Sequence, residues 1–236
     1  MTRRFTLLGL FALCFASLWS VTIHHKVEFD TSNFSLKIQE FDDTLATVVT
    51  WGDMYPSGYG GEYSLPSKHA SFAIPCGASQ ISIQNVKVTN GDKVQLTYPV
   101  SIVQLQTMNG DKIDVDKSIA SQLYEKEVSP VTVFARERFQ NVSDIVAVKI
   151  SPLKYTPQDL TLQLYTSVEF DIEYTDVPKM KTRSFEEEQY LMDDIAMARA
   201  LVVNPDFFDN EIATAKNTVS RTAGSAQELI TQNKSA

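Results

Sequence analysis

The clearest pattern in the sequence is an alternation of apolar and polar positions between residues 160 and 174. Each even-numbered position from Leu160 to Tyr174 is apolar or β-branched, while the odd-numbered positions are mainly polar. Period two predicts a β-strand with one buried and one exposed face, because successive side chains of a strand point to opposite faces. Since these fifteen residues exceed the usual strand length, we expect one long bent strand or two strands broken near Thr166 and Ser167.

Shorter alternating runs occur through most of the chain between residues 21 and 174, and their apolar positions fall at residues 34–38, 81–88, 94–98 and 146–150. A change of parity between Ile83 and Val86 predicts a bulge. The pairs Asn90-Gly91 and Asn109-Gly110 predict two hairpin turns, since Asn-Gly tolerates positive φ angles. Short strands without intervening helices predict an all-β fold, an antiparallel β-sandwich of a jelly-roll-like kind.

The segment from Trp51 to Gly61 is rich in glycine and aromatic residues and predicts a long surface loop. In this interpretation Trp51 closes a strand, and Tyr55 and Tyr59 cover the edge of the sandwich. An aromatic platform for a ligand is the alternative.

The pattern changes after Asp176. Ser184 and Glu187 have the spacing of a capping box, which predicts a helix that starts there. Asn204-Pro205 should stop it. Between these points an apolar stripe recurs every three or four residues, at Leu191, Ile195, Ala198 and Val202. Residues 179–236 are therefore expected to form a helical connector and a flexible tail.

The N-terminus has the pattern of a secretory signal peptide. Arg3 and Arg4 precede an apolar run from Phe5 to Trp19, and this run is short of the roughly 20 residues that span a bilayer. We therefore expect residues 1–20 to be a cleaved leader that leaves no stable membrane span, with an uncleaved anchor as the weaker alternative. The sandwich domain would then occupy residues 21–178.

Composition narrows the class of protein. The 236 residues are 43% hydrophobic and 21% charged, as in an ordinary globular protein. A net charge of −8 argues against a nucleic-acid partner, because phosphate binding needs clustered Lys and Arg. Without the leader, Cys76 is the only cysteine, so no disulfide forms within the chain. Stability must come from core burial, which fits a secreted or cell-envelope protein of a bacterium.

Candidate catalytic and metal-binding residues are few. His24 and His25 are adjacent, and on a strand they point to opposite faces, so they should not bind one ion together. His69 and Cys76 are the one candidate thiol–imidazole pair, with a small buried apolar residue as the alternative for Cys76. The chain has no phosphate-binding loop, zinc motif or nucleophile elbow. These observations predict no catalytic centre, no metal and no cofactor.

Two groups of proline and hydrophobic motifs follow one another along the chain. The first extends from Gly61 into the strand at residues 80–88, and the second from Pro152 into the strand at residues 160–170. Their motif residues are Gly61, Leu65, Pro66, Pro75, Pro152, Leu153, Tyr155, Pro157 and Tyr165. In this order they resemble the propeptide of gingipain-type (C25 family) cysteine peptidases, over about residues 27–176.

The resemblance implies an antiparallel β-sandwich that precedes the peptidase domain, assists its folding and keeps the zymogen inactive by covering the active-site cleft. The catalytic Cys and His belong to the downstream domain in that family. The implied partner is therefore a C25-type peptidase domain, in cis or in trans. A free-standing envelope module that binds a protein or a glycan is the alternative.

The resemblance also suggests where inhibition would act. Arginine-specific members place a basic residue, from a loop just upstream of the Pro-Leu-x-Tyr strand, in the specificity pocket. Here residues 142–146 contain no basic residue, so the candidates are Arg136 and Arg138, slightly earlier. Exposed charges on a strand or turn are the alternative for both arginines, and a pocket that prefers another side chain is equally compatible.

Overall fold

A computed structural model of the chain describes residues 20–41, 43–58, 60–106, 112–113, 129–139, 142–175 and 185–209. Residues 1–19 of the predicted leader (1–20), Tyr59, the Asn109-Gly110 pair, Ser184 and the tail after residue 209 lie outside the described residues, whereas Ser20 is described as the first residue of a strand. The described strands are antiparallel, and one helix follows them, so the predicted all-β class with a C-terminal helix is confirmed.

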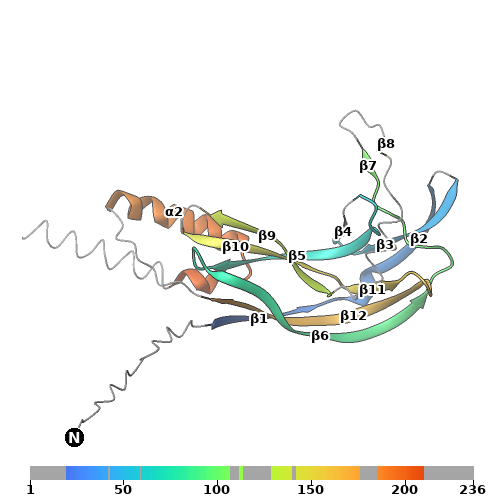
Figure 1. Cartoon of the computed structure of the whole chain (residues 1–236), viewed down its shortest axis with the longest axis horizontal. Coiled ribbons are helices and arrows are strands. Elements are labelled where there is room, and N and C mark those ends of the chain that lie inside the picture. The colour runs from blue at the N-terminus through green and yellow to red at the C-terminus, as the bar shows by residue number, and fades with distance from the viewer. Residues whose placement is uncertain are drawn as a thin grey trace, which may run out of the picture.

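The first sheet is built around the long strand β12 (Thr161–Thr175). One edge of β12 pairs with β6 (Ser79–Gln95). The other edge pairs with β1 (Ser20–Glu28) and, farther along, with β11 (Leu153–Thr156). Figure 1 shows these strands as the lower layer of the molecule.

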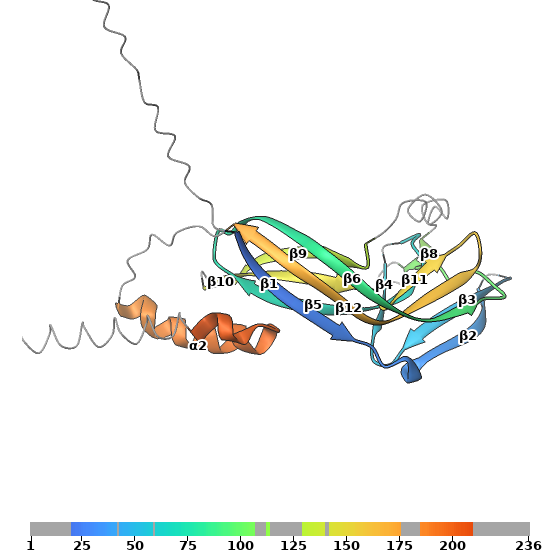
Figure 2. The ribbon, with the colours of Figure 1, turned by 90° about the horizontal axis from the view of Figure 1, so that it is seen from below.

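The second sheet has the strand order β4 (Tyr55–Ser57), β5 (Leu65–Ile74), β10 (Ser143–Ile150) and β9 (Val131–Phe139). A hairpin of β2 (Phe34–Phe41) and β3 (Thr44–Trp51) follows a short 3-10 helix, η1 (Thr31–Asn33). The short strands β7 (Leu105–Gln106) and β8 (Lys112–Ile113) pair with each other. Figure 2 shows the β2–β3 hairpin and the C-terminal helix near opposite ends of the molecule.

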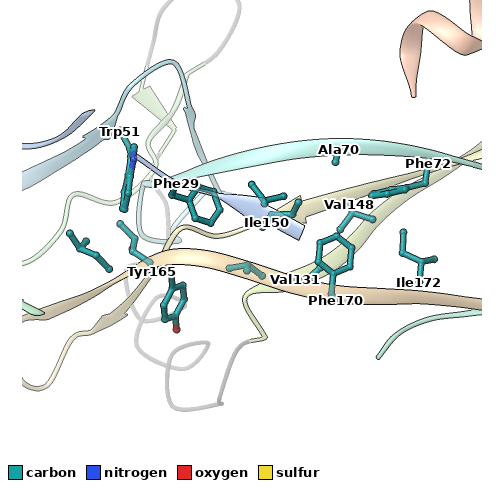
Figure 3. Packing of buried hydrophobic residues seen from close by; sticks show 14 of the residues in the cluster. Phe29, Trp51, Ala70, Phe72, Val131, Val148, Ile150, Tyr165, Phe170 and Ile172 are labelled. Carbon is teal, nitrogen blue, oxygen red and sulfur yellow. The ribbon is translucent and has the colours of Figure 1, made fainter. Parts of the chain in front are cut away.

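The two sheets face each other across one hydrophobic core. Alternate residues of β12, including Phe170 and Ile172, are buried against Val146, Val148 and Ile150 of β10. Phe72 of β5 meets Phe170 edge to face at 6.1 Å between ring centroids. Figure 3 shows Phe72, Val148, Ile150, Phe170 and Ile172 between the two layers of strands. The period-two prediction for β12 is therefore confirmed, and it forms one strand with a register irregularity at Thr166.

Bulges shape strand β6. The predicted parity change is confirmed: Asn85 has a φ of +51°, and two residues of β6, Asn85 and Val86, oppose the single residue Phe170 of β12 there. The predicted hairpin at Asn90-Gly91 is wrong, because both residues lie inside β6, at another bulge. A Cβ on Gly91 would lie 3.1 Å from Cγ2 of Thr166, so this glycine allows a close approach of β12 rather than a chain reversal.

Two further expectations change in the structure. The predicted strand at residues 94–98 is the end of β6, which stops at Gln95, although Leu96 remains buried. The aromatic segment after Trp51 contains the short strand β4, on which Tyr55 is 80% exposed rather than covering the sandwich edge. Trp51 itself ends β3 and is buried as expected, and its indole Nε1 donates a hydrogen bond of 2.9 Å to the Asp30 carbonyl.

The C-terminal helix packs on the outer face of the second sheet. Helix α2 (Phe185–Leu201) buries Ile195 and Ala198 against Ala73 of β5 and Val142, with Phe208 of the 3-10 helix η2 (Pro205–Phe208). The predicted helix and its stop before Asn204-Pro205 are confirmed. The buried residues of this cluster, separate from the main core, are Ala73, Val142, Ile195, Ala198 and Phe208.

Asn204 fastens this segment to the edge of β5. Its side-chain oxygen accepts a hydrogen bond from the Ala73 amide at 2.8 Å, and its amide nitrogen donates to the Ala73 carbonyl at 2.9 Å. The Val203 amide also donates to the Ser71 carbonyl at 2.9 Å. The Asn204 side chain thus supplies the pair of bonds that a neighbouring strand would supply. We call Val203 and Asn204 the C-terminal clasp.

Two adjacent histidines on β1 point to opposite faces, as predicted. His24 lies on the solvent face, with Nδ1 2.7 Å from Oδ1 of Asp171. His25 points inward, and its ring meets Phe72 and Phe170 edge to face at 5.1 and 5.6 Å. Burial lowers the pKa of His25, and the nearby charges of Lys68 and His24 lower it further.

Replacing His25 with phenylalanine is expected to reduce the loss of stability at mildly acidic pH. A lowered pKa in the folded state means that the unfolded chain binds the proton more readily. The contribution of neutral His25 is therefore complete above the unfolded-state pKa of about 6.5, and it is lost as the pH falls through the folded-state value. Urea unfolding between pH 7.5 and 5.0 measures the difference.

The matched control is His24→Phe, which changes the neighbouring histidine on the solvent face. This variant should keep most of the wild-type decline in the free energy of unfolding between pH 7.5 and 5.0, because burial, the largest cause of the lowered pKa of His25, is unchanged. A His25→Phe protein with the same decline as wild type would contradict the prediction.

Candidate functional site

The two candidate inhibitory arginines lie near the end of strand β9, and both contact one carboxylate. In Arg136, Nε and Nη2 both donate to Oδ2 of Asp144, with the Nε bond at 3.2 Å, and Nη2 also donates to the Ala78 carbonyl at 2.5 Å. In Arg138, Nε donates to Oδ1 of Asp144 at 3.2 Å. Asp144 is the second residue of β10, and its register partner on β9 is Arg138. The three side chains form a cluster at the end of the sandwich, which we call the Arg-Asp-Arg cluster.

Asp144 is the buried centre of this cluster. Its side chain is 3% exposed, against 37% for Arg136 and 58% for Arg138. Burial would raise the pKa of Asp144, but hydrogen bonds from Arg136, from the Gly77 amide at 3.2 Å and from Arg138 outweigh it and lower the pKa. Asp144 is therefore held as a carboxylate, and the cluster carries one net positive charge.

The position of Asp144 in the alternating pattern of its strand indicates a buried carboxylate, which the sequence analysis did not single out. Asp144 has the same parity as Val146, Val148 and Ile150, which all point into the core. A carboxylate at an inward position needs a cationic or hydrogen-bonding partner. The preceding strand supplies two arginines, and the hairpin register places both beside it.

The two arginines differ in how firmly they are held. Arg136 joins β9 to β10 and to the start of β6, whereas Arg138 is more exposed and, among the described residues, bonds through Nε to Asp144. Both lie on a strand rather than in a loop. A role for either arginine in a peptidase pocket stays a prediction, and Arg138 has the more accessible guanidinium.

Replacing Arg136 with methionine is expected to destabilise the domain more than replacing Arg138. Loss of Arg136 removes its bonds to Asp144 and Ala78 and leaves the buried carboxylate with fewer donors. We expect this to lower the free energy of unfolding by about 1–3 kcal/mol. The Arg138→Met variant should lose less than about 1 kcal/mol, because Arg138 is mostly exposed. Urea unfolding at pH 7 ranks the two, and equal losses would contradict this ordering.

The motif residues of the proposed family resemblance occupy structural positions. Tyr155 is buried on β11, its hydroxyl lies 3.3 Å from the Val100 amide, and its ring meets Tyr63 at 4.8 Å. Tyr63 lies within the first motif, so this contact joins the two motif groups. Pro152 accepts a hydrogen bond from the Tyr165 amide at 2.8 Å, and Pro157 accepts one from the Leu160 amide at 3.3 Å.

The first motif group directs the chain into β5 and out of it. Gly61 has a φ of +91°, which favours glycine, and its amide donates to the Val103 carbonyl at 3.1 Å. Leu65 starts β5, and Pro66 is buried on it opposite β4. Pro75 follows β5 directly, and its carbonyl accepts a bond from the Ala78 amide at 3.0 Å, closing a turn.

The structure keeps His69 and Cys76 apart. His69 lies on β5, and Ile74 at the end of this strand is five residues farther along the chain, which at about 3.3 Å per residue is roughly 17 Å. The His69 ring packs on Phe134 at 4.8 Å, and its Nε2 lies 3.3 Å from the Ser67 hydroxyl. The geometry of this pair therefore does not form a thiol–imidazole site. In the described part of the chain, no group of three or more His, Cys, Asp or Glu has a metal-binding arrangement.

The described residues include no helix that is both long and apolar enough to cross a membrane.

Comparison with solved structures shows a likeness of fold. The chain is similar to a chain in the complex of the RgpB pro- and mature domains from Porphyromonas gingivalis, with a TM-score of 0.56 and 14% identity over 78% of this chain and 93% of that one. A structure concerning the zymogenic latency of gingipain K from the same organism has a TM-score of 0.49 and 17% identity, over 70% and 97% of the two chains. No family model and no curated protein sequence matches. The expected resemblance to gingipain propeptides is thus confirmed at the level of the fold.

Proposed function

We propose that this chain contains the propeptide-like domain of a secreted gingipain-type cysteine peptidase. In this proposal residues 1–20 are a signal peptide, residues 21–178 are the propeptide-like sandwich, and residues 179–236 connect it to a peptidase domain that lies outside this sequence. The domain assists folding of the peptidase and keeps it inactive, and it contributes no catalytic residue.

The observation that carries the proposal is the fold shared with the RgpB pro- and mature-domain complex over 78% of the chain. Two features of the structure support it further. The two motif groups meet through Tyr63 and Tyr155, so their order along the chain corresponds to a contact in the fold. The candidate arginines lie close to the end of the sandwich, with Arg138 more than half exposed.

Inhibition of a purified peptidase tests the proposal. The chain is titrated into the mature domains of RgpB and of gingipain K, and cleavage of a fluorogenic peptide is followed. We expect inhibition that saturates at or below micromolar concentrations, together with a higher refolding yield of the denatured peptidase when the chain is present. Failure to bind either peptidase at micromolar concentration would overturn the proposal and favour a free-standing envelope module.

The same assay tests the inhibitory residue. If Arg138 enters the specificity pocket of a peptidase that the wild-type chain inhibits, Arg138→Ala should weaken inhibition of that peptidase strongly. Arg136→Ala is the matched comparison on the same strand. Equal inhibition by wild type and both variants would show that neither arginine serves this role.

A further inference from the structure

We propose that the outer face of the β5, β10 and β9 strands, around Phe134, is the surface on which the peptidase domain docks. This inference rests on the proposed function, because it names the surface through which that function acts. The surface consists of His69, Thr132, Phe134 and Lys149, and we call it the Phe134 surface.

A β-bulge brings Phe134 to this face. Ala147 of β10 pairs with Ala135, but the next residue, Val148, pairs with Val133, so Phe134 is the extra residue of β9. Its ring lies 4.8 Å from the ring of His69, two strands away, and the side chain remains 47% exposed. A bulge of this kind redirects a side chain, and such bulges are frequent beside functional sites.

The register supplies the rest of the Phe134 surface. Lys149 pairs with His69 on one side and Thr132 on the other, so the three side chains form a row on one face. This face is the outer one, because the adjacent residue Ile150 is fully buried in the core.

A second row of small side chains separates the Phe134 surface from helix α2. Ser71, Ala147 and Ala135 pair across the same three strands and point to the same outer face. A partner can therefore approach the backbone closely between the aromatic pair and the helix.

The opposite face of the molecule has a different character. On the outer face of the first sheet, charged side chains pair across strands, as in His24 with Asp171 and Lys87 with Glu169 at 3.5 Å. Asn85 also donates to Asp171 at 2.7 Å. These groups satisfy one another and solvent, which is typical of a solvated face. The Phe134 surface instead presents an exposed aromatic ring, of the kind enriched in protein interfaces.

The course of the chain indicates the occupant. Helix α2 lies on this same outer face, and the C-terminal clasp binds β5 at Ser71 and Ala73. Ser71 is two residues from His69, or about 7 Å along the strand. In the proposed function helix α2 and the C-terminal clasp belong to the connector to the peptidase domain, so the described part of this connector, up to Asp209, runs along the face that carries the Phe134 surface. A complementary surface on the partner would have an apolar pocket for the ring of Phe134 and, nearby, a carboxylate for the positive charge of Lys149.

Four single variants of the full chain compare this surface with an exposed apolar site elsewhere, and the fourth, Phe134→Ala, serves as a control for folding. Phe134→Glu and Lys149→Glu change the Phe134 surface. Ile38→Glu is the matched control, because Ile38 is 55% exposed on β2, outside this sheet. Binding of each to the mature domain of RgpB is measured by surface plasmon resonance at low and high salt.

We expect Phe134→Glu to weaken binding at least about tenfold, as for the loss of an aromatic anchor. Lys149→Glu should weaken binding by a smaller factor. Binding of the wild-type chain should weaken as the salt concentration rises, and this salt dependence should be lost in Lys149→Glu. Ile38→Glu should bind within about twofold of wild type. Phe134→Ala, with its circular-dichroism spectrum compared with wild type, separates loss of the contact from misfolding, and it should also weaken binding.

The outcomes separate the two proposals. If the wild-type chain does not bind, the proposed function fails, and the docking surface fails with it. If the wild-type chain binds and folded Phe134→Glu and Phe134→Ala proteins bind equally well, only the docking surface is wrong. Stronger loss in Ile38→Glu than in Phe134→Glu would place the interface on the β2–β3 hairpin instead and would also overturn this inference.

Discussion

Replacing Asp144 with alanine should destabilise the domain by about 3 kcal/mol at pH 7. The change leaves Arg136 and Arg138 without the carboxylate that holds them and removes the acceptor of the Gly77 amide. Loss of one member of a buried charged group commonly costs about 3–5 kcal/mol, and the partly exposed arginines keep the expected loss at the low end. Urea unfolding followed by tryptophan fluorescence measures the change.

The matched control is Asp171→Ala, which removes a carboxylate on the solvent face of β12. Asp171 also has a lowered pKa, because Asn85 and His24 donate hydrogen bonds to it. The Asp171 side chain is 16% exposed, against 3% for Asp144, so solvent can replace part of those bonds and the free energy of unfolding should fall less than in Asp144→Ala. Similar losses in the Asp144 and Asp171 variants would show that burial of the Arg-Asp-Arg cluster does not determine its contribution.

The pH dependence of the Asp144 effect has a defined sign. Because the folded-state pKa of Asp144 is lowered, its contribution is complete above the unfolded-state pKa of about 3.9. The contribution is lost as the pH falls from there through the folded-state value. The difference between wild type and Asp144→Ala should therefore be equal at pH 7 and pH 5, and it should shrink below about pH 4.

Replacing Ile195 with alanine should detach the C-terminal helix from the sandwich. Ile195 is almost fully buried in the small cluster with Ala73 and Phe208, and such a truncation commonly costs about 2–5 kcal/mol. A cluster of five buried residues has little stability to lose, so the expected result is local opening rather than global unfolding. Hydrogen exchange of the Ala73 and Val203 amides, which the C-terminal clasp protects, should become faster.

Met197→Ala is the matched control on the same helix. Met197 is 59% exposed, so its truncation should leave the protection of Ala73 unchanged. Exchange at Ala73 that is equally slow in wild type and Ile195→Ala would contradict the packing described for α2.

Much of the fold was predictable because local pattern and tertiary environment agree. Strand β12 pairs on both edges and buries one face along most of its length, so its sequence alternates clearly. The bulge near Asn85 could also be predicted, because a bulge shifts the apolar positions of a strand by one residue. Asn90-Gly91 failed as a turn signal for a physical reason: the same residue pair suits a hairpin and a bulge, and only the pairing with β12 distinguishes them.

The candidate site was less predictable than the fold. Arg136 and Arg138 were visible in the sequence, but their shared partner depends on the register between β9 and β10. The exposure of Phe134 depends on the same register, because without the bulge the alternation along β9 would place its side chain on the other face of the sheet. The apolar stripe of α2 was visible, whereas its partners Ala73 and Val142 lie more than 50 residues away in the sequence, where no local pattern connects them.

The bulges of β6 have a consequence for solubility. This strand is seventeen residues long, and among the described strands it pairs only with β12. A long, regular strand edge is a template for intermolecular pairing and aggregation. Positive φ angles at Gln80 and Asn85, with the further bulge at Gly91, interrupt the spacing of donors and acceptors along it. The domain can therefore expose this edge, because the interrupted spacing is poorly suited to pairing with a strand of a second copy.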